Sequence, residues 1–121
     1  MIRIYGIRNC TTMRKAFAWL DEHGVRYDFH DYRKAGVPVR ELERWVAVAG
    51  WPALANKHGT TWKRIPEDSR EGLDAKRAIE LLCAWPSAIR RPVLDTGSHL
   101  LVGFDPGLYA GLISPGVRAR T

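Results

Sequence analysis

The chain has 121 residues, 45% of them hydrophobic, which is enough for one domain that buries a core without disulfides. Its 19 Lys and Arg residues outnumber its 13 Asp and Glu residues, and the formal charge of +6 favours anionic partners. The basic residues are scattered rather than grouped in a stripe, which disfavours nucleic acid, and no run approaches the roughly 18 apolar residues of a membrane span.

The first thirty residues predict a strand, a helix and a second strand. Ile2–Tyr5 is a short apolar run, and Thr12–His23 repeats apolar residues at the i, i+3, i+4, i+7 spacing of a helix with one buried stripe. Gly24 is placed to end that helix, and Val25–His30 alternates apolar and polar residues as a half-buried strand does. A crossover of this length favours parallel pairing with a right-handed connection.

The middle of the chain is predicted to be helical. Pro38–Ala49 has one apolar face, and Trp51–Ala55 can begin a short second helix with a proline in its first turn. We expect a loop at His58–Trp62, followed by a helix over Asp74–Trp85 that Pro86 stops. The apolar face expected for the first of these helices consists of Leu42, Trp45, Val46 and Ala49.

The C-terminal part predicts two strands and a helix. Arg91–Asp95 enters a strand through a proline, Thr96–Ser98 is a turn, and His99–Phe104 is a second strand, so a hairpin is expected. Asp105 is an N-cap that starts a last helix, and residues 114–121 are expected to form a loose tail. The apolar residues expected to pack the last helix are Leu108, Tyr109, Leu112 and Ile113.

This order of elements predicts an α/β protein with a thioredoxin-like fold in a single domain, residues 1–113. A helical insertion, about residues 38–86, separates an N-terminal β-α-β unit from a C-terminal β-β-α unit. In such a fold the first helix begins at the carboxyl end of the first strand, where open α/β sheets place their ligands. The loop before the first helix is therefore the expected functional site.

Cys10 lies in this loop, at the start of the predicted helix. The first N–H groups of a helix have no intrahelical partner and carry partial positive charge, so they stabilise a thiolate relative to a thiol. Arg8, Arg14 and Lys15 add positive charge nearby. Thiols in such places have pKa values of about 3.5–7.5 rather than about 8.5, so Cys10 is predicted to be a nucleophile at neutral pH.

Burial is the alternative for Cys10, because cysteine often serves as a small apolar residue in a core. Its polar neighbours Asn9, Thr11 and Thr12 argue against a core position. For Cys83, which lies among apolar residues of a predicted helix, we expect the core position. Two cysteines so far apart make no disulfide framework, and no signal-peptide pattern follows the first residues, so the reducing cytoplasm is the expected compartment.

Three segments carry a family resemblance. They are Tyr5–Cys10, Leu54–Trp62, and Ile89–Leu94 followed by Leu101–Phe104. In this order and spacing they resemble the ArsC-type arsenate reductase family, most closely its YffB-like branch, to which the transcription regulator Spx is related. The resemblance spans residues 1 to about 113. It implies a thioredoxin-like fold, and members of the arsenate-reducing branch take electrons from glutathione and glutaredoxin.

The resemblance assigns roles to individual residues. The family's nucleophilic cysteine falls on Cys10, and the arginine that holds the oxyanion falls on Arg91. The proline equivalent to Pro92 is cis in thioredoxin-like folds, so a cis bond is expected here. Two further arginines of arsenate reductases fall on Asn56 and, approximately, on Gly103. Their loss argues against arsenate, whose several oxygens suit forked guanidinium groups, and favours glutathione or another carboxylate-bearing thiol.

The sequence also predicts how the thiol would react. Thioredoxin-type enzymes resolve a mixed disulfide with a second cysteine, and that position here is Met13. Cys10 would therefore act alone, with glutathione as the external thiol and co-substrate. Metal sites and bound cofactors are not expected, since the histidines lack ligand spacing. The catalytic candidates are Cys10 and Arg91, and the substrate-binding candidates are Asn9, Thr11, Thr12, Arg14, Asn56 and Pro92, with helix capping equally open for Thr11 and Thr12.

A regulatory role is the main alternative to an enzyme. Spx-like relatives use the thioredoxin-like surface to bind RNA polymerase, and many of them carry a Cys-x-x-Cys switch that Met13 removes here. The expected partners of an enzyme are glutathione or another small thiol or anionic substrate, with glutaredoxin as a further candidate. In the alternative, the partner is RNA polymerase.

Overall fold

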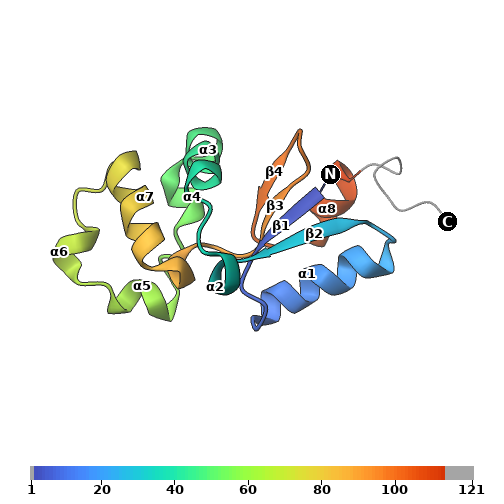
Figure 1. The fold of residues 1–121 in the computed structure, drawn as a ribbon, viewed down its shortest axis with the longest axis horizontal. Helices are drawn as coiled ribbons and strands as arrows, with labels where there is room; N and C mark the ends of the chain where they lie inside the picture. Colours follow the sequence, from blue (N-terminus) through green and yellow to red (C-terminus); the bar gives the residue numbers. More distant parts are fainter. Residues whose placement is uncertain (1, 114–121) are drawn as a thin grey trace. The chain divides into compact units, whose positions relative to one another are not determined.

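The computed structural model describes residues 2–113, which divide into two compact units. One unit combines the residues up to Lys34 with those from Arg91 onward, and the other spans Ala35–Arg90. The second unit contains the predicted helical insertion; that the chain is a single domain stays a prediction, and the expected tail lies outside the described residues. The elements are β1 (Ile2–Gly6), α1 (Thr11–Glu22), β2 (Tyr27–Asp31), α2 (Tyr32–Ala35), α3 (Val39–Ala49), α4 (Trp51–Leu54), α5 (Thr60–Arg64), α6 (Glu67–Arg70), α7 (Ala75–Ala84), η1 (Pro86–Ala88), β3 (Val93–Asp95), β4 (Leu100–Val102) and α8 (Pro106–Leu112) (Figure 1).

The first unit is built on a four-stranded sheet in the order β2-β1-β3-β4. β1 pairs in parallel with β2 and antiparallel with β3, and β3 and β4 form the expected hairpin. The crossover helix α1 ends just before Gly24, whose φ of 64° is the left-handed conformation that glycine adopts without a steric penalty. The predicted β-α-β and β-β-α units, and with them the thioredoxin-like fold, are confirmed.

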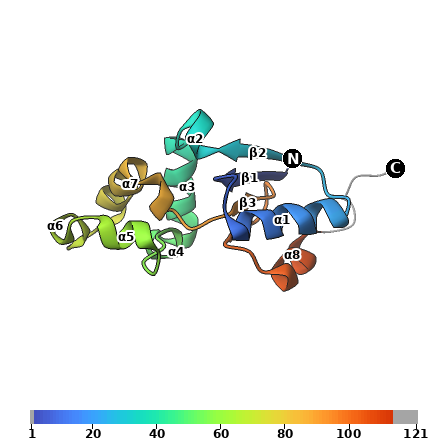
Figure 2. The ribbon, with the colours of Figure 1, turned by 90° about the horizontal axis from the view of Figure 1, so that it is seen from below.

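Helices α1 and α8 lie on the same side of this sheet (Figure 2). Ile4 of β1 is the register partner of Leu94 of β3, so both side chains point to that side. Burying side chains of this size contributes roughly 1.5–3 kcal/mol each, so the packing fixes where α1 begins. The buried residues of this core cluster are Ile2, Ile4, Met13, Ala16, Leu20, Val25, Leu94, Tyr109 and Ile113.

The second unit consists of helices α3 to α7 and the short η1 helix. α3 buries Leu42, Trp45 and Val46 and packs against α4 and α7, as its predicted apolar face requires. An antiparallel bridge between Ala55 and Ile89 joins the segment after α4 to the segment after η1.

The sequence prediction is wrong at several places in these elements. The expected loop at His58–Trp62 instead starts α5, because Trp62 is buried and α5 packs against η1, which outweighs the weak helix propensity of the two threonines. Ala49 and Leu108 were placed on buried faces and are exposed. Ala49 lies in the last turn of α3. In α8 the buried residue is Tyr109, and Ile113 is buried directly after the helix.

The N-cap of α8 gives a test of the fold. Asp105→Ala is expected to lower the free energy of unfolding by about 1 kcal/mol, because its carboxylate accepts the N–H groups of Gly107 and Leu108 at 2.9 and 3.2 Å. Denaturant unfolding measures this loss. Asp105→Asn keeps an acceptor and should change stability by only a few tenths of a kcal/mol. An equal loss in both variants would contradict the capping role.

Candidate active site

Cys10 is the N-cap residue of α1, in the segment that leads out of β1. Its backbone is extended, with φ −139° and ψ 133°, and its carbonyl accepts the N–H of Arg14 at 3.0 Å. The side chain is partly buried and packs against the core cluster, which leaves part of the thiol accessible. The predicted position of the thiol at the start of the helix is therefore confirmed.

The surroundings of Cys10 favour its thiolate. Burial raises the pKa of the thiol, but the backbone N–H groups of Met13 and Thr12 and the Arg91 guanidinium outweigh burial and hold the pKa below its ordinary value. The sulfur has no capping hydrogen bond of regular geometry. We therefore attribute the effect of the amides to the positive end of the helix.

Arg91 reaches this place through the pairing of β1 with β3. The register pairs Tyr5 with Val93, so the residues just before Val93 run past the end of β1. The Arg91–Pro92 peptide bond is cis, as expected. The sheet thus brings together the two residues predicted to be catalytic.

Gly6 makes room for this arrangement at the end of β1. A Cβ atom at Gly6 would lie 2.5 Å from the Met13 sulfur and 3.6 Å from Cγ of Arg91. The first distance is far too short for two heavy atoms in contact. A larger residue here would require the Met13 side chain to move, whereas the Arg91 side chain lies at an ordinary contact distance.

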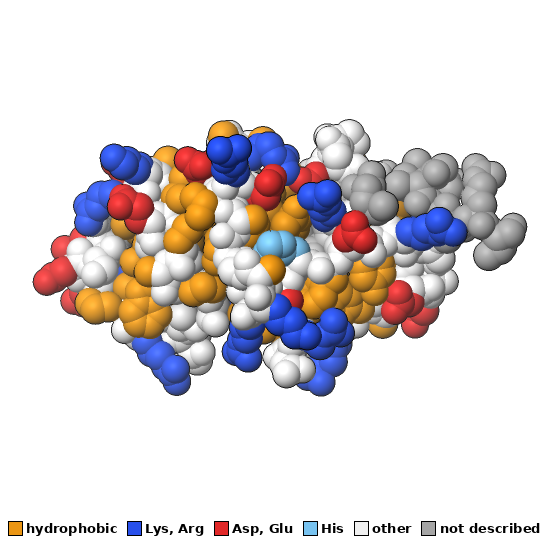
Figure 3. Space-filling model, viewed as in Figure 1, with side chains coloured by type: hydrophobic (Ala, Val, Ile, Leu, Met, Phe, Trp, Pro, Cys, Tyr) orange, Lys and Arg blue, Asp and Glu red, His pale blue; other side chains and the backbone are white. Residues whose placement is uncertain are grey.

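The basic residues next to Cys10 in the sequence do not supply the charge that lowers its pKa. Lys and Arg side chains surround the start of α1 (Figure 3), but the charged group that acts on the thiol is Arg91. The Arg8 guanidinium carbon instead lies 5.2 Å from the centre of the Phe29 ring. Arg14 and Lys15 have exposed side chains. The expectation that these three residues tune Cys10 is wrong.

The remaining substrate-binding candidates lie in different environments. Asn9 and Thr11 are exposed beside Cys10, and Thr12 is half-buried, while Pro92 is buried. Asn56 belongs to the other unit, where its backbone N–H donates to the carbonyl of Ala88. Their contacts with a substrate stay predictions.

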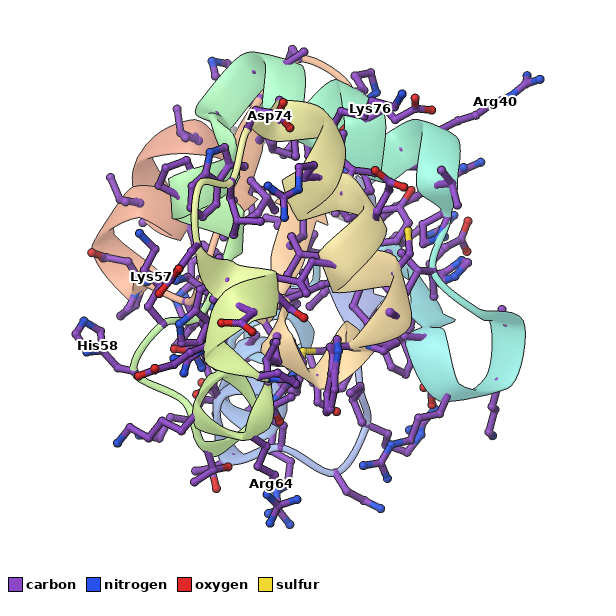
Figure 4. All side chains as sticks on the ribbon, turned by 90° about the vertical axis from the view of Figure 1, so that its left-hand side faces the viewer. Arg40, Lys57, His58, Arg64, Asp74 and Lys76 are labelled. Carbon is purple, nitrogen blue, oxygen red and sulfur yellow. The ribbon has the colours of Figure 1, made fainter. Side chains whose placement is uncertain are left out.

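Two exposed side chains, Lys57 and His58, follow Asn56 in the segment between α4 and α5. His58 points away from the helices (Figure 4), and the ammonium of Lys57 lies 4.8 Å from the centre of the Trp51 ring. Lys57 is therefore held against an aromatic face of its own unit.

The first unit has no second cysteine that could resolve a mixed disulfide at Cys10 among its described residues. Met13 occupies the position of the second cysteine in a Cys-x-x-Cys motif and is fully buried. Cys83 lies on α7 in the other unit, and both cysteines are free. Cys83 is only partly buried, so its expected core position is wrong; burial, followed by the charge of Glu43, raises its pKa. Of the two thiols, only Cys10 lies in a place that favours the thiolate.

Tyr32 is a residue near the site that the sequence analysis missed. It follows β2 directly, its side chain is 3% exposed, and its hydroxyl has no hydrogen-bond partner among the described residues. Burial raises the pKa of this hydroxyl, Tyr5 raises it further, and Arg91 lowers it. In the sequence, the one signal for a place near the site was its position directly after the second predicted strand.

Residues 2–113 contain neither a cluster of metal ligands nor a membrane-spanning helix. No group of three or more His, Cys, Asp or Glu side chains in this part could hold a metal ion. None of its helices has the length and apolar character needed to cross a membrane.

Comparisons with known proteins agree with this arrangement. The model of the ArsC family matches residues 5–112. The solved structure of the YFFB protein is 47% identical, with a TM-score of 0.91, and covers 94% of this chain and 100% of its own. An arsenate reductase (ArsC) related protein from Brucella melitensis is 46% identical, with a TM-score of 0.72 and 92% of each chain covered.

Two curated relatives cover nearly the same part of the chain. An uncharacterized protein of Haemophilus influenzae is 37% identical over 109 residues, which are 90% of this chain and 96% of the relative. Global transcriptional regulator Spx 1 of Lactococcus lactis is 25% identical over 107 residues, which are 87% of this chain and 83% of the relative. The chain is thus similar over most of its length both to an arsenate reductase related protein and to a transcriptional regulator.

Replacing Arg91 tests the electrostatic account of the site. In a Cys83→Ser background, Arg91→Ala is expected to raise the pKa of Cys10 and slow its alkylation at neutral pH, because the thiolate loses a hydrogen bond and a charge. Alkylation rates measured across pH report this change. Arg14→Ala also removes one positive charge, but from an exposed position, and should leave the pKa of Cys10 unchanged. Equal effects of the two variants would contradict the assignment to Arg91.

Replacing Gly6 tests the packing under the site. Gly6→Ala is expected to cost about 1–3 kcal/mol of stability, because the methyl group has to displace the sulfur and the terminal methyl of the fully buried Met13 side chain. The control is Gly111→Ala on α8, where nothing lies within 4 Å and the substitution should stabilise the helix by about 0.5–1 kcal/mol. Thermal or denaturant unfolding distinguishes the two, and an unchanged stability of Gly6→Ala would refute the close approach.

Proposed function

Since this chain belongs to the ArsC family, we propose that it is a thiol oxidoreductase that works with one nucleophilic cysteine and an external thiol, for which glutathione is the candidate. Cys10 is the nucleophile, and Arg91 stabilises its thiolate and holds an anionic group of the substrate. The formal charge of +6 favours a substrate with carboxylates, as glutathione has.

One observation carries this proposal: a partly exposed thiol whose pKa is lowered by helix amides and an arginine. Reactive cysteines lie in electropositive, partly accessible surroundings of this kind, whereas structural cysteines are buried in apolar ones. Cys83 provides the comparison within the same chain: it is partly buried as Cys10 is, but burial and the charge of Glu43 raise its pKa. A structural role for Cys10 would need neither the charge nor the access.

The proposed reaction is thiol–disulfide exchange. The Cys10 thiolate attacks one sulfur of a disulfide, a new sulfur–sulfur bond forms, the old one breaks, and the leaving thiolate takes the negative charge with it. An external thiolate then attacks the outer sulfur of the mixed disulfide, releases the product disulfide and restores the Cys10 thiolate. In the whole cycle one external thiolate enters the product disulfide and one thiolate of the original disulfide is released, so the charge and the number of disulfide bonds are conserved.

Met13 explains why the second thiol would come from outside. In place of a second cysteine, a fully buried methionine packs over Gly6. Cys10 could not close an intramolecular disulfide with it. A monothiol mechanism therefore fits this chain better than a dithiol one.

Arsenate is a poorer candidate for the substrate. The resemblance places family arginines on Asn56 and approximately on Gly103, and neither residue can offer a forked guanidinium group. Gly103 has a φ of 85°, a conformation that arginine would adopt only with strain. One arginine beside the thiol suits a single carboxylate better than a tetrahedral dianion.

A transcription regulator is the second candidate, and the similarity to Global transcriptional regulator Spx 1 favours it. In this case the thioredoxin-like unit would dock on RNA polymerase, and the reactivity of Cys10 would not be needed. Binding to the polymerase that survives Cys10→Ser is the result that would support this function over the enzyme.

Incubation with glutathione disulfide tests the proposed function. We expect one glutathione to be attached to Cys10 and released again by excess reduced glutathione, as followed by intact-protein and peptide mass spectrometry. Cys10→Ser should abolish the modification, Arg91→Ala should slow it, and the matched control Cys83→Ser should leave it unchanged. Modification that occurs at Cys83 instead, or at neither cysteine, would sink the proposal.

A further inference from the structure

The hydroxyl of Tyr32 is a buried polar group that neither the fold nor the proposed reaction uses. The side chain is 3% exposed, and the hydroxyl oxygen is shielded from solvent without a hydrogen-bond partner among the described residues. Leaving such a group unpaired in the interior is unfavourable. The hydroxyl of Tyr109 is unpaired in the same way, but that of Tyr32 also lies where the charge of Arg91 acts on it.

The sheet places Tyr32 at the edge where Arg91 and Cys10 meet. Gly6 is the register partner of Asp31, the residue before Tyr32, and Gly6 is also where Arg91 passes over β1. Residues Tyr5 and His30 form the next register pair, with ring centres 5.3 Å apart, and the His30 ring lies 6.1 Å from that of Tyr32. These aromatic contacts hold the Tyr32 ring in place behind the site.

Arg91 is close enough to Tyr32 for its charge to act on the hydroxyl. The guanidinium also acts on the Cys10 sulfur, so the same cation lies within reach of both groups. A guanidinium can only donate hydrogen bonds, whereas a tyrosine hydroxyl can accept one. The Tyr32 oxygen is therefore an acceptor available to Arg91.

We propose that Tyr32 is a positioning residue for Arg91, with a hydroxyl that accepts a hydrogen bond from the guanidinium once Cys10 has formed a mixed disulfide. This inference rests on the proposed function. In the reduced protein Arg91 interacts with the Cys10 thiolate. In the mixed disulfide it turns to Tyr32 and stays at the site for the next thiolate.

The charge balance of the reaction explains why a second partner is needed. When the Cys10 thiolate attacks glutathione disulfide, a bond forms between Cys10 and one glutathione sulfur, and the other glutathione leaves as the thiolate. The negative charge departs with it, so Arg91 loses its anionic partner at Cys10. A hydroxyl that is unpaired in the reduced state and paired in the mixed disulfide shifts the equilibrium toward the mixed disulfide.

Tyr32→Phe tests this inference, with Tyr109→Phe as the matched control. Tyr109 is also fully buried and its hydroxyl is likewise without a partner among residues 2–113, but burial is the single cause of its raised pKa, with no part for Arg91. The equilibrium constant for mixed-disulfide formation, measured in glutathione redox buffers in a Cys83→Ser background, is expected to fall about three- to tenfold in Tyr32→Phe, as for the net loss of one typical intramolecular hydrogen bond. It should not change in Tyr109→Phe.

Two further measurements distinguish a positioning role of Tyr32 from a merely structural one. Both variants should keep or slightly raise the melting temperature of the reduced protein, since each loses an unpaired hydroxyl. The pKa of Cys10 in reduced Tyr32→Phe should match that of the parent. An unchanged equilibrium constant in Tyr32→Phe, or equal falls in both variants, would overturn the role of Tyr32 while leaving the proposed function intact. If the parent forms no mixed disulfide, the proposed function fails first and this inference fails with it.

Discussion

The electrostatic attraction between the Cys10 sulfur and the positive groups around it depends on where β1 ends. The end of this strand lies between the first turn of α1, which supplies backbone amides, and the segment before β3, which supplies Arg91. Gly6, at the end of the strand, leaves room for the buried side chain of Met13, which comes from the first turn of α1. Without the pairing of β1 and β3 the amides would remain, but the thiol would lose its guanidinium.

The parts of this arrangement that local chemistry determines could be predicted from the sequence. The apolar stripe of α1, the glycine that ends it and the polar loop before it indicate a helix that starts at Cys10. Asp105 and its proline likewise mark the start of α8. Arg91 is different, because no local pattern brings it to Cys10. Only the resemblance to a family predicted that contact, and the β1–β3 register provides its physical cause.

The failed predictions concern side chains whose surroundings are set by tertiary packing rather than by their neighbours in sequence. Two threonines gave little reason to expect α5, which forms because Trp62 is buried there. Arg8 is close to Cys10 in sequence but lies over the Phe29 ring. Cys83 lies among apolar neighbours in sequence and yet is partly exposed, next to the charge of Glu43. Proximity along the chain was in each case a poor guide to which charge or surface a side chain meets.

The central claim is that helix amides and Arg91 make Cys10 ionise more easily than an ordinary cysteine. Following the Cβ chemical shift of Cys10 by NMR across pH, in the reduced native protein and in the urea-unfolded chain, tests it directly. The account predicts a transition in the native protein below that of the unfolded chain, which should lie near the ordinary value of about 8.5. A native transition at or above the unfolded one would contradict it.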